Sequence, residues 1–236
     1  MPVILNIETS SKFCSVALSI DGYAEFHIED SKEMNHASAL APYVSKCLEE
    51  AKRREIKIDA VAVSIGPGSY TGLRIGLSLA KGVCFGLDIP LITVSTLKML
   101  ATKAMFRHFD LDSTELLVPL IDARRMEVYT AAYNFALEEI LPPQGMIITE
   151  ESFRELSSEH KLVFIGNAVD KCKNVIKADN VYWSGNSEPY ATDMVALAEM
   201  AWRKNEFADI AYAVPEYLKE YQAIIGKNKV LESVSK

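Results

Sequence analysis

The chain has 236 residues, of which 49% are hydrophobic and 24% charged, so it can bury a core as one large domain or two small ones. Its net charge of −7 and isoelectric point near 5.2 argue against a protein that grips nucleic acid with its whole surface. The sequence starts directly with a strand pattern, and no stretch approaches the roughly 20 apolar residues that span a bilayer. We therefore expect a cytoplasmic protein that meets no membrane.

Strand patterns open the chain. Residues 3–8 form an apolar run, residues 14–20 alternate with period two, and Asp21-Gly22 is a strong hairpin signal before a third run at 23–29. The other elements predicted in this half are a helix from about Asn35 to Arg54, strand 60–65, a glycine-rich turn, a helix ending at Leu87, strand 90–94 and a helix from Ser95 to about Phe106. Three antiparallel strands followed by alternating helices and strands suggest a ribonuclease-H-like lobe.

A similar order restarts at residue 116. The elements predicted there are strands 116–122 and 126–134, short strand pieces within 138–148 that Pro142-Pro143 interrupts, a short helix after Thr149, strand 162–167, and helices near 168–176 and 192–205. This half looks like a shortened repeat of the first. We expect an α/β fold with an N-terminal lobe at 1–110 and a C-terminal lobe at 111–236, divided in the loop between Arg107 and Thr114.

Patterns for metal or nucleophilic chemistry are sparse. No CxxC pair occurs, and the cysteines lie in apolar strand or helix patterns, which favours buried thiols in a reducing compartment: Cys14, Cys47, Cys84 and Cys172. No His-x-x-x-His or His-Glu-x-x-His spacing occurs either, so a helical zinc or iron pair is missing from the sequence. Two Ser-x-x-Lys spacings lack their companion motifs, and we attribute them to chance.

A glycine-rich loop, Gly66-Pro67-Gly68-Ser69-Tyr70-Thr71-Gly72, joins a predicted strand to a predicted helix. Its backbone N–H groups could face an anion, but its spacing matches neither the Walker A motif nor the dinucleotide fingerprint. The turn after the first strand adds a carboxylate and two hydroxyls at Glu8-Thr9-Ser10. Candidates for a phosphate site are therefore Thr9, Ser10, Gly68 and Thr71. The alternative for Glu8, which we favour, is a carboxylate that only orders the turn.

The helix after this loop has an unusually smooth face. Gly72, Gly76 and Ala80 recur every fourth residue, with a polar row at Arg74, Ser78 and Lys81 beside them. Because glycine inside a helix costs roughly 0.5–1 kcal/mol relative to alanine, three internal glycines need a packing partner: Gly76, Gly82 and Gly86. That partner is either the sheet of the same chain or another protein, and the sequence leaves both open.

An adjacent arginine pair, Arg124-Arg125, follows Asp122 in the turn between two predicted strands of the second half. Such a pair could contact a phosphate or a carboxylate of a partner. It could equally be two solvated turn residues.

Motifs along nearly the whole chain resemble the TsaB (YeaZ-like) family of bacterial proteins that act in making threonylcarbamoyladenosine in tRNA. The motifs are Val3–Asn6 with Glu8-Thr9-Ser10, Gly66-Pro67-Gly68-Ser69-Tyr70-Thr71-Gly72-Leu73-Arg74, Gly76, Ala80-Lys81-Gly82, Pro90-Leu91, Val94-Ser95, Asp122-Ala123-Arg124-Arg125, Val128-Tyr129 and Pro215-Glu216-Tyr217-Leu218. The resemblance implies two ribonuclease-H-like lobes of the actin, sugar-kinase and Hsp70 type (ASKHA), the second one shortened. In two places the chain departs from the family: Glu8 stands where Asp is usual, and Lys219 where Arg is common.

The resemblance also implies that the chain is not an enzyme. Family members are non-catalytic paralogues of the metal-containing transferase TsaD, and the TsaD histidine pair falls on Ser95–Met99 here, where no histidine occurs. They are dimerisation or scaffold subunits needed for threonylcarbamoyl transfer to N6 of the adenosine beside the anticodon. The implied lone chain needs no cofactor, and ATP or ADP and metal belong to the partner subunits.

The implied partners are TsaD in a heterodimer, the ATPase TsaE, and a second copy of the chain in isolation, with tRNA met only through the complex. The docking residues expected on the N-terminal helices are His36, Leu40, Tyr43, Gly72, Leu73, Gly76, Leu77 and Ala80. The alternatives are a nucleotide-binding enzyme, or an M22-type metallopeptidase of the glycoprotease family. Direct tRNA binding by the lone chain is disfavoured by its acidic charge.

Overall fold

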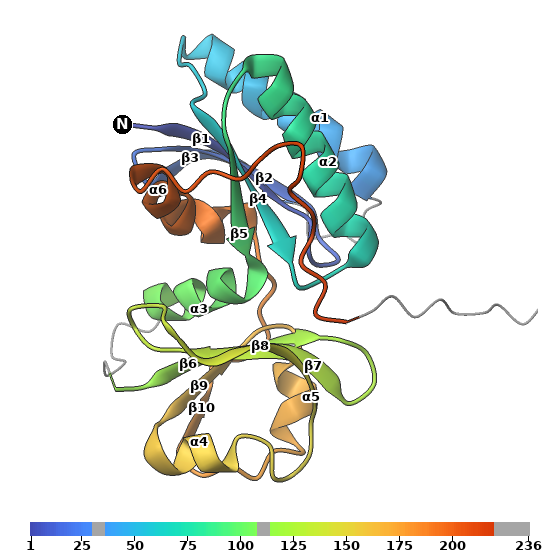
Figure 1. Cartoon of the computed structure of the whole chain (residues 1–236), viewed down its shortest axis with the longest axis vertical. Helices are drawn as coiled ribbons and strands as arrows, with labels where there is room; N and C mark the ends of the chain where they lie inside the picture. Colours follow the sequence, from blue (N-terminus) through green and yellow to red (C-terminus); the bar gives the residue numbers. More distant parts are fainter. Residues whose placement is uncertain (30–35, 108–113, 220–236) are drawn as a thin grey trace, which may run out of the picture.

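Each half of the chain folds around one five-stranded mixed sheet, and the two resulting lobes are stacked along the long axis of the computed structural model (Figure 1). The structure describes residues 1–29, 36–107 and 114–219. The first sheet has the order β3-β2-β1-β4-β5, in which β2 runs antiparallel to both of its neighbours, β1 and β3, while β4 and β5 run parallel to β1. Its strands are β1 (Val3–Glu8), β2 (Ser15–Ile20), β3 (Tyr23–Glu29), β4 (Ala60–Gly66) and β5 (Leu91–Ser95).

The second sheet repeats this topology. Its order is β10-β9-β6-β7-β8, so β6 takes the place of β1, with an antiparallel pair on one side and a parallel pair on the other. Its strands are β6 (Leu116–Asp122), β7 (Glu127–Tyr133), β8 (Glu139–Ile147), β9 (Leu162–Ile165) and β10 (Val181–Trp183). The expected two-lobed α/β fold, with a second half that repeats the strand order of the first, is confirmed.

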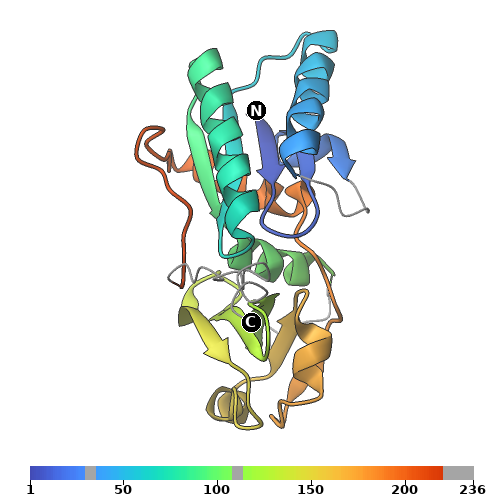
Figure 2. The same cartoon turned by 90° about the vertical axis from the view of Figure 1, so that its right-hand side faces the viewer.

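Helices cover both faces of the first sheet. Because neighbouring residues of a strand point to opposite faces, Leu5 and Ile7 join the apolar cluster under α1 and α2, whereas Ile4 joins the cluster under α6. Figure 2 shows α1 and α2 side by side on one face. The helices on the first sheet are α1 (His36–Arg53), α2 (Tyr70–Leu87), the 3₁₀ helix η1 (Ala191–Met194) and α6 (Val195–Arg203). Helix α3 (Thr96–Arg107) lies between the two sheets (Figure 1), with Met99 in a cluster of the first sheet and Leu97 and Leu100 in a cluster of the second. The helices α4 (Arg154–Glu159) and α5 (Val169–Lys173) belong to the second half of the chain.

The chain returns to the first lobe near its end. Helix α6 packs on the first sheet, and the Ala208 N–H donates to the Leu91 carbonyl at 2.8 Å. The predicted lobe at 111–236 therefore needs a correction, because residues from η1 onward lie against the N-terminal sheet. The boundary itself stays a prediction, since residues 108–113 lie outside the described residues.

Some predicted elements differ from the observed ones in detail. Pro142-Pro143 does not end β8, because β8 is an edge strand and the two prolines fall where its register with β7 shifts, between the pairs Leu141–Ala132 and Gln144–Thr130. The three-residue strand β10 was not predicted. The expected start of α1 at Asn35 lies outside the described residues. None of the described helices is long and apolar enough to cross a membrane.

Close packing between α2 and the β1–β2 turn accounts for two glycines of the helix. A Cβ atom on Gly72 would overlap the Thr9 carbonyl oxygen, and one on Gly76 would overlap the Thr9 hydroxyl. By contrast, a Cβ on Gly82 or Gly86 would meet nothing within 4 Å. The first two glycines are therefore needed inside the lobe, while the other two lie on its outer surface.

This difference predicts opposite effects of the same substitution. We expect Gly72→Ala to lower the free energy of unfolding by about 1–3 kcal/mol, because the added methyl group must displace the Thr9 backbone. Gly82→Ala should raise it by about 0.5–1 kcal/mol, since alanine is the better helix former and the space is free. Urea unfolding followed by circular dichroism measures both, and equal shifts would contradict the packing described.

Candidate functional site

The β1–β2 turn closes the space in front of the glycine loop. The Ser69 N–H donates to the Ser10 carbonyl at 2.7 Å, and a Cβ on Gly68 would overlap the Ser10 backbone. Thr9 and Ser10 are 0% and 3% exposed, and of the four phosphate candidates only Thr71 is exposed. The prediction of a phosphate site at Thr9, Ser10, Gly68 and Thr71 is therefore corrected, because Thr9 and Ser10 are buried and their turn packs directly against the loop.

A buried carboxyl group lies behind this turn. Glu8 is fully buried, and its Oε1 accepts a hydrogen bond from the Ser10 N–H at 2.5 Å. Its Oε2 has no hydrogen-bond partner within the described part of the chain. Burial raises the pKa of Glu8 to about 7, against the smaller lowering effect of the hydrogen bond from the Ser10 N–H. The carboxyl thus orders the turn.

A C-terminal strap, residues 214–219, crosses the glycine loop and joins the lobes. The Glu216 N–H donates to the Ile65 carbonyl of β4 at 2.7 Å. The ring of Tyr217 stacks on that of Tyr70, with the ring centroids 4.9 Å apart. Arg74 donates from Nε to the Tyr217 hydroxyl at 2.8 Å, and its guanidinium carbon lies 4.2 Å from the centre of the Tyr70 ring. Further along, Lys219 pairs with Glu127 in the second lobe. The strap therefore fixes both the start of α2 and the position of Arg74.

A groove of about 520 Å³ runs between the outer sides of α1 and α2. Its lining is mostly apolar, with Arg74 and Ser78 as polar members: Ala37, Leu40, Ala41, Arg74, Ile75, Ser78 and Leu79. Ile75, Leu79, Gly82 and Gly86 follow one another at helical spacing, so the exposed surface of α2 continues the groove towards the C-terminal end of the helix. Phe85, beside this line, is 84% exposed.

The predicted docking residues of α2 do not form a free surface. All five are buried on the side that faces the sheet and the β1–β2 turn: Gly72, Leu73, Gly76, Leu77 and Ala80. The smooth face of α2 is therefore not a docking surface. It packs against the sheet and the β1–β2 turn of the same chain, which is one of the two alternatives that the sequence left open. It is the opposite side of the helix that is exposed.

The predicted docking residues of α1 are divided. Leu40 contributes to the groove, although only 1% of it is exposed. The ring of Tyr43 packs against the core of the lobe. His36 Nε2 lies 3.0 Å from the Ser11 carbonyl and 3.2 Å from that of Phe13, so this residue ties the start of α1 to the end of the β1–β2 turn.

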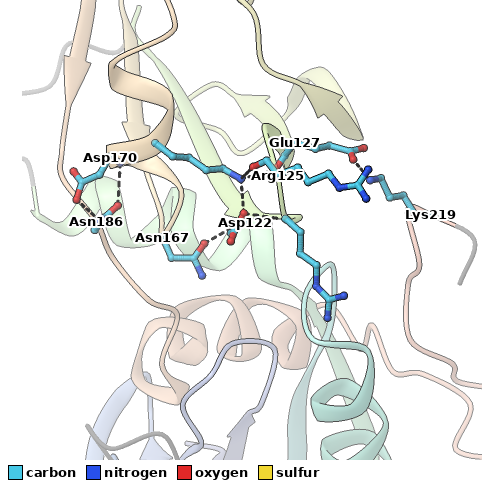
Figure 3. A network of polar contacts seen from close by, with 9 residues as sticks. Asp122, Arg125, Glu127, Asn167, Asp170, Asn186 and Lys219 are labelled. Atoms are coloured by element: carbon cyan, nitrogen blue, oxygen red, sulfur yellow. Dashed lines mark hydrogen bonds and ion pairs between the residues drawn. The ribbon is translucent and has the colours of Figure 1, made fainter. Parts of the chain in front are cut away.

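The turn between β6 and β7 is held by a dense polar network (Figure 3). Lys171 donates to the carbonyl oxygens of Arg125 at 2.9 Å and Glu127 at 2.7 Å, and it pairs with the Asp122 carboxylate. The same carboxylate accepts from the Arg124 N–H at 3.0 Å. Asn167 Oδ1 accepts from the Asp122 N–H at 2.8 Å. The side chains of Lys171, Asp122 and Asn167 thus all hold the backbone of this turn in place.

A second hollow, of about 510 Å³, lies between β3, α3 and η1. On its wall Lys103, 6% exposed, donates to the Glu188 carbonyl and to Asp193 Oδ2, both at 2.7 Å. Asp193 therefore balances the buried cation. In the described ranges, no three His, Cys, Asp or Glu side chains lie close enough together to hold a metal ion. The four cysteines are buried and free, as expected.

Sequence reasoning missed several residues that shape these surfaces. Tyr217 reaches Arg74 across 143 residues, and Lys171 reaches the β6–β7 turn across more than 40. No local sequence pattern predicts either contact, because the partners are far apart in the sequence. Phe85 could have been found, because a large aromatic residue beside two helix glycines is a signal for an intermolecular contact.

Comparison with known proteins agrees with this architecture. Residues 30–233 match the family model described as TsaD, tRNA N6-adenosine threonylcarbamoyltransferase. The chain is 31% identical to the tRNA threonylcarbamoyladenosine biosynthesis protein TsaB of Bacillus subtilis (strain 168), over 93% of this chain and 95% of that protein. It is 37% identical to the protein of the same name of Haemophilus influenzae, over 92% and 93%. A crystal structure from Pseudomonas aeruginosa, of a protein with similarity to the peptidase YeaZ, superposes with a TM-score of 0.78 at 28% identity and covers 93% of this chain and 100% of that one.

The buried carboxyl of Glu8 predicts a pH-dependent stability. Its pKa is near 7 when folded and near 4.5 when exposed, so the folded protein binds this proton more tightly than the unfolded chain does. As pH rises from 4.5 to 7, the free energy of unfolding of the wild-type protein should therefore fall by about 3 kcal/mol relative to that of Glu8→Gln, which carries no titrating carboxyl group at this position. Chemical unfolding of both proteins at several pH values measures the difference. A difference that does not change with pH would show that the folded carboxyl titrates at its ordinary value.

Proposed function

The chain belongs to the TsaB family of tRNA threonylcarbamoyladenosine biosynthesis proteins, and we propose that it is a non-catalytic subunit that binds the transferase TsaD. In this proposal TsaD transfers threonylcarbamoyl to N6 of the adenosine beside the anticodon, and the ATPase TsaE joins the pair. Without TsaD, two copies of the chain associate through the same face.

The outer face of α2 is the observation that carries the proposal. Two glycines inside a helix lower its stability by roughly 0.5–1 kcal/mol each, and a Cβ at Gly82 or Gly86 would meet nothing within 4 Å of the described chain. Phe85 stands 84% exposed between them. A partner helix lying along this line would bury Phe85 and approach the α2 backbone closely at both glycines. The glycines are then explained by a contact that the lone chain lacks.

The relation between the two proteins supports TsaD as the occupant. Because most of this chain matches the TsaD family model, TsaD should present an equivalent helix pair. Two related helix pairs can meet about a pseudo-twofold axis, as identical ones do in an isologous dimer. One surface on this chain then serves both the heterodimer and the homodimer.

The competing functions are a nucleotide-binding enzyme and an M22-type metallopeptidase. Two packing observations weigh against a nucleotide site on the lone chain. The glycine loop is closed by Ser10, and a Cβ on Gly166, in the turn after β9, would overlap the Leu120 backbone. We place ATP or ADP and metal on the partner subunits, and no cofactor on this chain. We further propose that the fold is of the actin, sugar-kinase and Hsp70 type and that the protein works in the cytoplasm.

Substitutions on the outer face of α2 test the docking surface. We expect Gly82→Trp and Phe85→Glu each to weaken co-purification with TsaD at least tenfold, because one blocks close approach and the other places a charge in an apolar contact. Unfolding midpoints should change little, since neither side chain is packed within the lobe. Phe106→Glu, which changes another exposed aromatic residue at the end of α3, is the matched control and should leave TsaD binding intact.

The outcome that contradicts this proposal is undiminished TsaD binding by both variants. Isothermal titration of the lone wild-type chain with ATP and magnesium separates the competing function. Stoichiometric tight binding, or turnover without TsaD, would favour a nucleotide-dependent enzyme instead.

A further inference from the structure

The β6–β7 turn presents two arginines on an unusually rigid backbone. Arg124 and Arg125 have φ angles of 70° and 50°, in the left-handed region that residues with a Cβ rarely adopt. Two such residues in succession persist only where the surrounding structure holds them. Here the hold comes from Asp122 and Lys171, which bond to the backbone of the turn.

The hydrogen bonds described for this turn go to its backbone and leave the two guanidinium groups exposed. Arg124 and Arg125 are both exposed, and within the described ranges neither side chain makes an ion pair. The two acidic residues of the turn itself are already balanced, because Asp122 pairs with Lys171 and Glu127 with Lys219. The turn therefore carries a local excess of two positive charges on a chain whose net charge is −7.

We propose that Arg124 and Arg125 are a contact site for the phosphodiester backbone of the tRNA that the complex modifies. This inference rests on the proposed function, since it takes the chain to act on tRNA as part of an assembly with TsaD. A guanidinium group offers a planar fork of donors that matches phosphate oxygens, and a fixed backbone lowers the entropy lost when the fork is engaged.

Two observations favour RNA over an acidic segment of the protein partner. The turn belongs to the second lobe, whereas α2 runs from the glycine loop away from that lobe (Figure 1), so the part of the docking surface formed by Gly82, Phe85 and Gly86 lies at the end of α2 remote from β7. Successive phosphates along a strand also suit two adjacent cations at a turn. Because the rest of the chain is acidic, the contact adds to a composite surface and does not bind RNA strongly alone.

The test uses the reconstituted complex of this chain with TsaD and an unmodified tRNA transcript whose anticodon is flanked by the target adenosine. The main variant is Arg124→Asn/Arg125→Asn, because asparagine tolerates the left-handed conformation and keeps the turn. The matched control is Arg53→Gln/Arg54→Gln, which removes the same charge from an adjacent pair at the end of α1 that is tied to Glu50 and Glu25. TsaD co-purification is read first, and tRNA affinity is then measured at several salt concentrations.

We expect the main variant to keep TsaD binding and to lose about tenfold or more in tRNA affinity at low salt. The slope of log affinity against log salt should become shallower by about 0.7–0.9 for each lost phosphate contact. Arg124→Lys/Arg125→Lys should lie between wild type and the asparagine variant, and the control pair should match wild type.

Unchanged tRNA affinity and slope in the asparagine variant would overturn the inference, as would an equal loss in the control pair. Loss of TsaD binding in the main variant would instead identify the turn as a protein contact. Should wild type itself fail to bind TsaD, the proposed function fails and not this site alone, so the two outcomes can be told apart.

Discussion

The approach of the β1–β2 turn to the start of α2 is the constraint on which the first lobe depends. Gly68, Gly72 and Gly76 lack side chains at the points where the backbone or hydroxyl of Thr9 and Ser10 comes in. This contact closes the glycine loop and buries the face of α2 formed by Gly72 and Gly76. The helix is thereby fixed in one orientation, with Phe85 and the outer glycines turned to solvent.

The two functional surfaces proposed for the chain lie on different lobes and are linked by the C-terminal strap. Tyr217 holds Arg74 at the edge of the α1–α2 groove, and Lys219 pairs with Glu127 beside the β6–β7 turn. One side of the molecule is then suited to a protein partner and another to RNA. Such a division fits a subunit that supports the chemistry of a related transferase without performing it.

Much of the fold could be predicted from the sequence because its signals are local. Alternating apolar residues identify the strands, Asp21-Gly22 marks a hairpin, and the restart at residue 116 reveals the repeated topology. The return of α6 to the first sheet could not be predicted in this way, since its apolar stripe fits either lobe. For α2 the sequence showed which residues are small but not which side of the helix meets the chain's own Thr9. The rigid arginine turn depends on Lys171, a residue more than 40 positions away.

We propose that the outer face of α2 binds a protein partner while the β6–β7 turn stays free for RNA. Amide hydrogen exchange of the chain alone, with TsaD, and with TsaD plus tRNA tests both parts in one experiment. We expect TsaD to slow exchange along α2 and the facing side of α1, whereas exchange at the turn from Asp122 to Glu127 slows only after tRNA is added. Exchange on α2 that TsaD does not slow, or a turn protected by TsaD alone, would contradict the proposal.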